Sequence, residues 1–556
     1  MQHRLFFELS RMFGQEVPLY DKSLLVNTVC NKTVCKLFGH LYDGFTISDE
    51  HLEKTSGERH GAIRIGKPSE YRWIARLFAT FAMEPHNFYD MTDVGAKSQP
   101  IIATAFRSKL NPGHRVFCSL LMTDYFDLTT RKRIETLLET REVFSEKAKD
   151  LIIKDEKQGG LDWDDANELI SECVNLIFKW TGKAHDYQLY KDLCATGFKI
   201  AADIACFKSH HLNHLTPNTL DIDLYTAAMK FCMGEMDVTN FQQRAKITLN
   251  RLVEFADRNY LKLHFKILTR TQIDVFEMRQ VTAESFWQLV TELSQRLCQP
   301  DLQLHKLKHS GFKDHTEGPP VGIPVLLRQD AYKALSEPVT FSNSDGAEFQ
   351  ASHSARFGEI EQRFYATTPL GRSLYDRCLT DAERDSAKRN ATSNEERYTQ
   401  AFAAYPRALP ELLEQKLVYC LFYPTQPGRA AKGNITTTDI SKLIRLGYVD
   451  YQGLRYEDFL PTSAAGIFAS NLNQYGTKST AAEKSVYCQA MLEEILERKI
   501  VDANLTYAGL QAESLLNVYS QLGLVDTLTP MEKFELERAM AEVKKIKLDI
   551  DFSSTN

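Results

Sequence analysis

The sequence lacks the long apolar run that a membrane-spanning helix requires. Crossing a bilayer takes about 18 or more apolar residues in a row, and no stretch approaches that length. Residues 1–8 combine one arginine with a short apolar patch and then become charged, which is typical of neither a signal peptide nor a transit peptide. These absences predict a cytoplasmic protein that does not enter a membrane.

Clustered positive charge and patterned cysteine are also missing. The formal net charge is −6 at pH 7 and no long Lys/Arg block occurs, so nothing indicates a nucleic-acid partner. The 11 cysteines include no CxxC pair, and the closest two in sequence are Cys30 and Cys35. An unpatterned set of this kind in a large chain indicates reduced thiols in the core of a cytosolic protein.

The short motifs of the common enzyme classes do not occur. The sequence has no GxGxxG, no GxxxxGK[ST], no GxSxG and no HExxH. This removes the simplest nucleotide-binding, hydrolase and metalloprotease interpretations. The remaining candidates are isolated histidines and carboxylates in apolar or glycine-bounded patches.

Length and periodicity predict a protein of two or three lobes. A chain of 556 residues is too long for one compact core, and 43% apolar with 25% charged residues is the profile of an ordinary globular protein. Helical and strand-like periodicities both occur, which predicts the α+β class. We expect an N-terminal helical segment, a first part of a catalytic core with a helical hairpin, a helix-rich insertion, a second part of that core and a C-terminal helical segment. Their respective bounds are 1–55, 56–227, 228–302, 303–480 and 481–556.

Local patterns predict where helices and strands lie. Helical spacing covers 5–54 with a break at Val17-Pro18, and it returns at 70–83, 127–155, 163–180, 241–259, 283–298 and 530–548. Strand-like runs occupy 58–66, 204–223, 263–276, 325–328 and 355–365. The charge-dense stretch 383–398 is predicted to be an exposed loop or helix.

Three patches carry candidate chemistry. In the first, His60 and Arg64 share a face of a strand, so a metal ligand and a guanidinium would line one cavity. The second holds His210, His211 and His214, and imidazole is the commonest metal ligand. A surface histidine with a surface arginine, and a polar loop before a proline, are the plainer interpretations of these two patches.

The third patch is the strand-like run around Glu359 and Glu361, which share a face. A solvated, salt-bridged edge is its plain interpretation. Together, two histidines and one glutamate from separate strands are the parts of a facial triad, which holds Fe(II) and leaves positions open for substrate and O₂. The wide spacing of the patches adds little to this hypothesis.

At these patches the chain resembles the 2-oxoadipate dioxygenase/decarboxylase family, also called the 2-hydroxyglutarate synthase family. The resembling blocks occur in order along the chain. They are Gln15–Pro18, Glu58–Arg64, Phe88–Asp90, Thr104–Arg107, Asn213–Pro217, Thr219–Asp223, Leu326–Gln329, Ala355–Arg363, and Tyr456–Pro461 followed by Ser463–Phe468.

The resemblance implies a vicinal-oxygen-chelate-like central β-sheet, a half-barrel wrapped by helices. It implies that His60, His214 and Glu359 bind Fe(II). Glu359 is favoured over Glu361 because the distantly similar 4-hydroxyphenylpyruvate dioxygenase ends its site with a Glu-Ile-x-Gln-Arg strand whose first glutamate binds iron. Arg64 falls on the family's substrate-carboxylate arginine.

The resemblance also implies substrate contacts and shows three departures. We assign His60, Arg64, Thr462 and Ser463 to substrate binding, with Arg328 as the second choice of cation for a carboxylate. Thr462 stands where a valine is common, and Asn218 replaces an arginine. Residues 228–302 are a long insertion, which we expect to be peripheral, as a lid or an interface.

The implied reaction converts 2-oxoadipate and O₂ into 2-hydroxyglutarate and CO₂, in lysine degradation. The expected partners are therefore a 2-oxo dicarboxylic acid and O₂, with no prediction of oligomeric state. Two alternatives stay open: a dioxygenase of the same fold that acts on another 2-oxo acid, and a non-catalytic binding protein that retains the fold.

Overall fold

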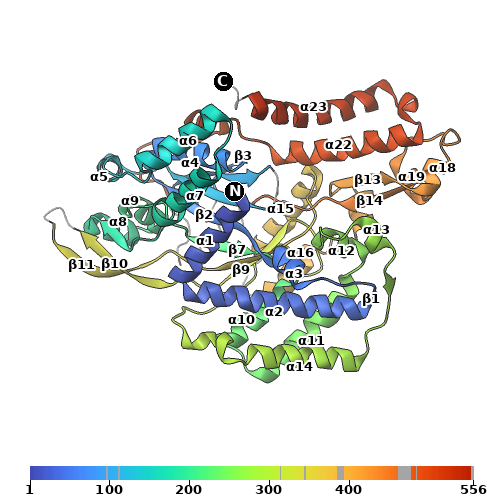
Figure 1. The fold of residues 1–556 in the computed structure, drawn as a ribbon, viewed down its shortest axis with the longest axis horizontal. Helices are drawn as coiled ribbons and strands as arrows, with labels where there is room; N and C mark the ends of the chain where they lie inside the picture. The colour runs from blue at the N-terminus through green and yellow to red at the C-terminus, as the bar shows by residue number, and fades with distance from the viewer. Residues whose placement is uncertain are drawn as a thin grey trace.

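The computed structural model describes residues 1–94, 98–109, 113–313, 315–342, 346–384, 394–460, 478–483 and 485–552. Thr462 and Ser463, two of the predicted substrate contacts, lie outside these residues. The described part is a mixed α/β structure in which helices surround several sheets (Figure 1). Every helix within it is too short or too polar to cross a membrane.

A five-stranded mixed sheet lies at the centre of the N-terminal half. Its order is β3-β4-β5-β2-β7, in which β2 runs parallel to β5 and antiparallel to β7. Its strands are β2 (Glu58–Ile65), β3 (Met83–Asp90), β4 (Ile101–Ser108), β5 (Arg115–Leu121) and β7 (His214–Pro217). All residues of β4, β5 and β7 are buried, as expected for a sheet covered on both faces.

Smaller sheets lie around the central one. The other strands are β1 (Tyr42–Asp43), β6 (Lys183–His185), β8 (Glu277–Met278), β9 (Leu327–Ala331), β10 (Ser336–Ser342), β11 (Glu348–Ser354), β12 (Glu359–Arg363), β13 (Cys420–Pro424) and β14 (Val449–Gly453). They pair as β1-β8, β11-β10-β6, β12-β9 and β13-β14. The β10–β11 hairpin projects from the left side of Figure 1.

Proline and capping side chains set the ends of many helices. Pro18 stands at the first turn of α2, where its missing N–H costs nothing, so α1 ends just before it. The helices that bear on the argument below are α1 (Gln2–Glu16), α2 (Pro18–Leu41), α4 (Pro68–Thr80), α5 (Leu128–Glu139), α6 (Glu146–Gln158), α7 (Trp163–Glu172), α9 (Lys199–Cys206), α10 (Ile222–Cys232), α11 (Val238–Phe255), α12 (Arg258–His264), α13 (Arg270–Asp274), α14 (Ala283–Leu297), α15 (Pro369–Arg384), α16 (Asn394–Ala401), α22 (Ala503–Leu522) and α23 (Pro530–Phe552).

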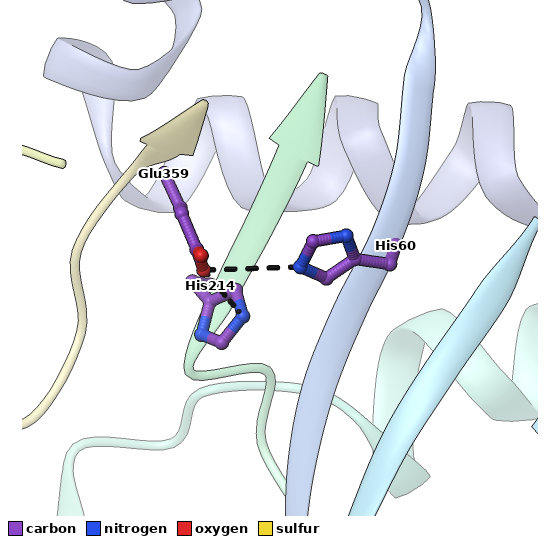
Figure 2. Close-up of side chains that lie close together, drawn as sticks. All are labelled: His60, His214 and Glu359. Carbon is purple, nitrogen blue, oxygen red and sulfur yellow. Dashed lines mark ion pairs between the residues drawn. The ribbon is translucent and has the colours of Figure 1, made fainter. Parts of the chain in front are cut away.

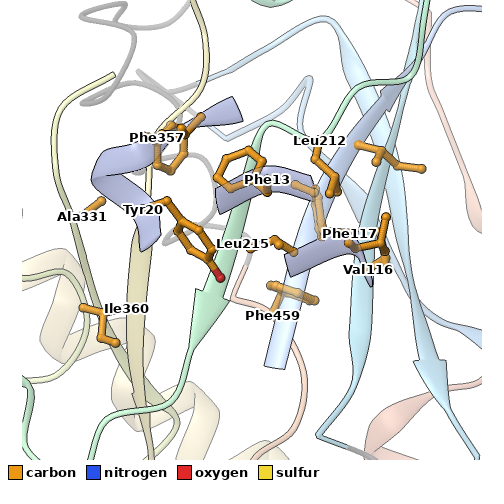
Figure 3. Close-up of a cluster of buried hydrophobic side chains, with 14 of the residues drawn as sticks. Phe13, Tyr20, Val116, Phe117, Leu212, Leu215, Ala331, Phe357, Ile360 and Phe459 are labelled. Carbon is orange, nitrogen blue, oxygen red and sulfur yellow. The ribbon is translucent and has the colours of Figure 1, made fainter. Parts of the chain in front are cut away.

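The two faces of the central sheet carry different side chains. On one face, α4 packs against β4, and the ring of Tyr71 lies 6.4 Å from that of Phe106. Alternation along the strands places His60 and Phe117 on the opposite face. The Phe459 ring packs there beside Phe117 (Figure 3), with ring centroids 5.1 Å apart, and its centroid lies 4.8 Å from that of the His60 ring. We call this second surface the site face.

The β9–β12 ladder lies beside the β7 edge of the central sheet. The backbone N–H of Thr219, just after β7, donates to the carbonyl of Glu361 at 2.9 Å. Glu359 and Glu361 point to one face of the ladder, whereas Gln362 points to the other. Because β12 lies beside β7, its alternate residues Glu359 and Glu361 point toward the site face.

The segment predicted to be a helix-rich insertion, 228–302, forms helices that pack on the N-terminal helix α2. Helices α10, α11 and α14 pack on α2 along the bottom of Figure 1. Leu261 and Phe265 are fully buried, and the Phe265 ring lies 5.9 Å from that of Phe38 in α2. These side chains complete the apolar surroundings of α2.

A second hydrophobic cluster occupies the C-terminal part of the described chain. It combines apolar residues of 365–460 and 503–528 with Leu263 and apolar residues of 323–327. In it, α22 packs on β13, and the rings of Tyr419 and Tyr507 stack at 5.9 Å. The long helices α22 and α23 lie side by side at the top of Figure 1.

Several local predictions are confirmed, one is confirmed in part and one is wrong. The structure has helices within 5–54, 70–83, 127–155 and 530–548, and strands within 58–66 and 355–365. Strands were predicted across 204–223 and 263–276. In the first run β7 is a strand, between the end of α9 and the start of α10, whereas the second run holds the end of α12 and the whole of α13. Asp257 and Thr269 cap α12 and α13 through side-chain acceptors, and this capping outweighs the alternating apolar pattern.

Candidate metal centre

Three strands bring two histidines and one carboxylate together. His60 comes from β2, His214 begins β7 and Glu359 begins β12, and Figure 2 shows their side chains converging. Two glycines allow the approach. A Cβ on Gly61 would lie 2.8 Å from Leu215 Cδ2, and one on Gly358 would lie 2.3 Å from the ring of Tyr332.

The distances among these three side chains suit the binding of one shared metal ion. Glu359 Oε2 lies 3.0 Å from His214 Nε2 and 3.8 Å from His60 Nε2. The two imidazole rings are perpendicular, with centroids 5.7 Å apart. One donor atom from each residue lies within 4.8 Å of the others, a grouping found at no other place in the described residues.

Burial and charge suit a divalent cation at this point. The three side chains are at most 5% exposed, and Glu359 Oε1 has no hydrogen-bond partner. Burial opposes ionisation, but His214 and His60 outweigh it and lower the pKa of Glu359 to about 2. Burial lowers the pKa of His214, which favours the neutral imidazole that coordinates metals. The donor set therefore fits one metal ion and places it at a buried position.

A buried carboxylate holds His60 from its other side. His60 Nδ1 lies 3.1 Å from Oε2 of Glu361. The opposite oxygen of Glu361 accepts from Arg115 at 2.8 Å and from Arg363 at 2.7 Å. Although burial opposes its ionisation, Arg363, Arg115 and His60 hold the pKa of Glu361 well below its usual range. Glu361 is thus a fixed anion behind the imidazole.

The same charges anchor the segment 455–460. Arg115 also donates to the Glu457 carboxylate at 3.1 Å, and Arg363 donates to the backbone carbonyl of Asp458 at 2.8 Å. Phe459, next in the chain, packs at right angles to the His60 ring, with centroids 4.8 Å apart. The segment before the predicted contacts Thr462 and Ser463 is therefore tied to the charges that surround His60.

Arg64 lies on the site face, as predicted, and is paired within the protein. It is 3% exposed, and its Nη1 donates to Oδ2 of Asp203 at 2.6 Å. The other oxygen of Asp203 lies 2.8 Å from His353 Nε2 and 3.2 Å from His211 Nε2. Asp203 therefore fixes the position of the guanidinium.

The structure does not bring Arg328 to this site. Arg328 stands opposite Gln362 in the β9–β12 ladder, so its side chain points to the face away from Glu359. There its guanidinium pairs with Asp223 at 2.9 and 3.1 Å. Of the two arginines chosen from the sequence, only Arg64 shares a face with the candidate ligands.

The two other histidines of the second patch have different partners. His210 Nε2 lies 3.1 Å from Glu70 Oε2, in a buried cluster that Arg141 completes. His211 faces Asp203. Neither belongs to the group formed by His60, His214 and Glu359.

Sequence reasoning missed Asp203 and the position of Phe459. Asp203 was included in no motif, and 204–223 was predicted as a strand, so a helical carboxylate facing Arg64 was not expected. Phe459 lies in a block that resembles the family, but nothing in its neighbours indicated contact with His60. Glu361 had a usable signal, because residues two apart in a strand share a face.

Comparison with known proteins supports a family assignment. The profile of the family described as 2-oxoadipate dioxygenase/decarboxylase matches residues 5–243 and 290–471. The 2-oxoadipate dioxygenase/decarboxylase of Pseudomonas putida is 33% identical over 526 residues, covering 91% of this chain and 93% of the relative. That of Escherichia coli is 31% identical over 494 residues, covering 87% and 91%.

A solved structure agrees with the sequence comparison. The crystal structure of the hydroxyglutarate synthase from Pseudomonas putida in complex with 2-oxoadipate superposes with a TM-score of 0.64 at 30% identity. The match covers 94% of this chain and 97% of that one. Because the profile matches more than half of the chain and the relatives match nearly all of it, the chain belongs to the 2-oxoadipate dioxygenase/decarboxylase family.

Proposed function

We propose that this protein is an Fe(II)-dependent dioxygenase that converts 2-oxoadipate and O₂ into 2-hydroxyglutarate and CO₂ in lysine degradation. The observation that carries the proposal is the buried group of His60, His214 and Glu359 in a chain of this family. Two neutral imidazoles and one carboxylate are the donor set of mononuclear iron oxygenases. The free thiol state of all eleven cysteines supports a cytoplasmic setting.

The proposed reaction balances with 2-oxoadipate and O₂ alone, without a further organic co-substrate. The bond between C1 and C2 of 2-oxoadipate breaks, and C1 leaves as CO₂. One oxygen atom of O₂ completes the new carboxylate at the former C2, and the other becomes the hydroxyl on the former C3. Both atoms of O₂ therefore enter 2-hydroxyglutarate, and the five-carbon product needs no external reductant.

His60, His214 and Glu359 would hold the iron. Bound Fe(II) would supply the electrons that activate O₂ and a Lewis-acidic centre for the keto acid end of the substrate. The Glu361 carboxylate lies 3.1 Å from Nδ1 of His60, and an anion on that side of the ring favours the orientation in which Nε2 faces Glu359. The Phe459 ring packs at right angles to that imidazole, with centroids 4.8 Å apart, and so contributes to its burial.

Arg64 would bind the far carboxylate of the substrate. Its guanidinium is buried on the site face and held by Asp203, which fixes the direction of its donors. A guanidinium binds a carboxylate through two parallel N–H groups. A cation at this place favours a dicarboxylic 2-oxo acid over an arylpyruvate, and it disfavours a non-catalytic protein that has kept only the fold.

We further propose that the site-forming strands are a vicinal-oxygen-chelate-like half-barrel. The central sheet supplies His60 and His214, and the adjoining β9–β12 ladder supplies Glu359. Ligands on neighbouring strands that curve around one point are what such a half-barrel would provide.

Product analysis tests the proposed function. The purified protein, loaded with Fe(II) without air and then given 2-oxoadipate and oxygen-18 gas, should form 2-hydroxyglutarate carrying two heavy oxygen atoms. A Glu359→Ala variant serves as the control and should consume no O₂. Turnover of phenylpyruvate in place of 2-oxoadipate would support the related dioxygenase instead, and no O₂ uptake with either acid would support a binding protein.

A further inference from the structure

We propose that the hydroxyl of Ser119 is a second group that binds the far carboxylate of the substrate, beside Arg64. This inference rests on the proposed function, because it assigns a further specificity residue to the same site. Three observations carry it: the position of Ser119 in the sheet, the lack of a partner for its hydroxyl, and the side chains around it.

The register of the central sheet places Ser119 next to Arg64. Parallel strands β2 and β5 pair His60 with Arg115 and Arg64 with Ser119. Residues paired in this way point to the same face, with neighbouring strands about 4.8 Å apart. Ser119 therefore lies on the site face, in the row of Arg64.

Its hydroxyl is buried and has no hydrogen-bond partner. Ser119 is fully buried, and no donor or acceptor of the described chain reaches its Oγ. Buried hydroxyls are nearly always hydrogen-bonded, because losing water without a replacement is unfavourable. A serine that serves only packing would be replaced by alanine without loss, so the unpaired Oγ indicates a partner that binds from outside the chain.

The neighbours of Ser119 identify the chemistry of that partner. Across the sheet, Ser119 stands between Arg64 on β2 and Ala103 on β4. Its one polar neighbour in the row is thus a cation, so a ligand group that satisfies both must accept hydrogen bonds and carry negative charge. A carboxylate does so, taking N–H groups from Arg64 and the O–H of Ser119.

The position along the strand fits the far end of a 2-oxo dicarboxylic acid. Arg64 and Ser119 lie four residues along β2 from the row of His60, which is about 13 Å between Cα atoms. Side chains that lean inward from both ends shorten this span. A ligand held at His60 through its keto acid end would therefore reach the Ser119 row only with its other end.

A pair of serine variants tests the proposal on the Fe(II)-loaded enzyme. Ser119→Ala removes the unpaired hydroxyl, whereas the control Ser108→Ala removes a buried hydroxyl of β4 that donates to Gln2 Oε1 at 2.8 Å. The measurements are the thermal midpoint without substrate and the KM for 2-oxoadipate and for 2-oxohexanoate. The latter has a methyl group in place of the far carboxylate.

Ser119→Ala should keep or raise the midpoint without substrate and should raise the KM for 2-oxoadipate about tenfold, with the KM for 2-oxohexanoate unchanged. Ser108→Ala should lower the midpoint and leave both KM values as they are. An equal change for the two acids, no change for either, or a lower midpoint in Ser119→Ala would overturn the inference. A wild-type enzyme that makes no product from 2-oxoadipate would instead overturn the proposed function, before any variant is compared.

Discussion

Glu361 lies behind His60, with Oε2 3.1 Å from the imidazole Nδ1, while Nε2 of the same ring faces Glu359. The carboxylate is kept ionised by Arg115 and Arg363. An anion at Nδ1 favours the tautomer that leaves the Nε2 lone pair available to a metal.

Glu361→Gln should therefore weaken metal binding by about 10–100-fold, because a neutral amide orients the imidazole less firmly. Titration of the metal-free protein with Fe(II) under nitrogen, or with Co(II) followed by absorption, measures the affinity. Glu457→Gln is the matched control, since Glu457 also pairs with Arg115 but is not in contact with His60. Equal affinity losses in both variants would show that Glu361 acts through the arginines alone.

Removing any one ligand should abolish metal binding. His60→Ala, His214→Ala and Glu359→Ala each leave two donors, and we expect purified protein with little iron and no O₂ uptake. Elemental analysis gives the iron content. His211→Ala is the control and should keep its iron, because His211 faces Asp203. If the His211→Ala control loses its iron and His214→Ala keeps it, the assignment of His214 as the second ligand is wrong.

Arg64→Lys should lower kcat/KM for 2-oxoadipate, with iron still bound. The loss should correspond to about 2 kcal/mol of transition-state stabilisation. The charge remains, but the two parallel N–H groups of the guanidinium are lost. Arg328→Lys should have an effect of less than about 0.5 kcal/mol, since Arg328 points to the opposite face and pairs with Asp223. A larger loss in the Arg328 variant would favour the second arginine as the substrate cation.

His114 should make the stability of the protein fall in acid. Burial, with Arg59 nearby, lowers the pKa of His114 to about 4, and its ring stacks on Phe6 at 4.6 Å. The unfolded chain takes up this proton near pH 6.5 but the folded chain does not. The stabilisation is therefore complete above about pH 6.5 and is lost as the pH falls toward 4.

His114→Phe keeps an aromatic ring and removes the titration. Between pH 7 and pH 4.5, the free energy of unfolding of the wild type should fall by about 2 kcal/mol more than that of the variant. Urea unfolding at the two pH values gives this difference. Between pH 7 and pH 8 the gap between the two proteins should stay constant. Parallel pH profiles throughout would show that His114 is protonated equally in the folded and unfolded chains.

The sequence predicted the candidate ligands better than the surroundings that hold them. His60 stands in one short strand and Glu359 with Glu361 in another, and alternation fixes which side chains share a face within each strand. That these strands meet was implied only by the resemblance to the family. Asp203 could not be linked with Arg64, because the contact joins a helix to a distant strand. The run 263–276 alternates like a strand, yet it holds the end of α12 and all of α13, helices that Asp257 and Thr269 cap. The register between β2 and β5 could not be predicted from the sequence either, so nothing indicated that Ser119 pairs with Arg64.

The origin of the three ligands on β2, β7 and β12 has a consequence for biosynthesis. His60 leaves the ribosome early, but the set is incomplete until Glu359 has emerged and β12 has docked beside β7. Nascent chains shorter than this cannot capture the ion with all three donors. Contacts between such distant segments also form slowly, because closing long loops is entropically unfavourable. Binding of the metal by all three donors therefore requires that the chain has been synthesised past Glu359. A translation product that ends before Glu359 would lack the complete site.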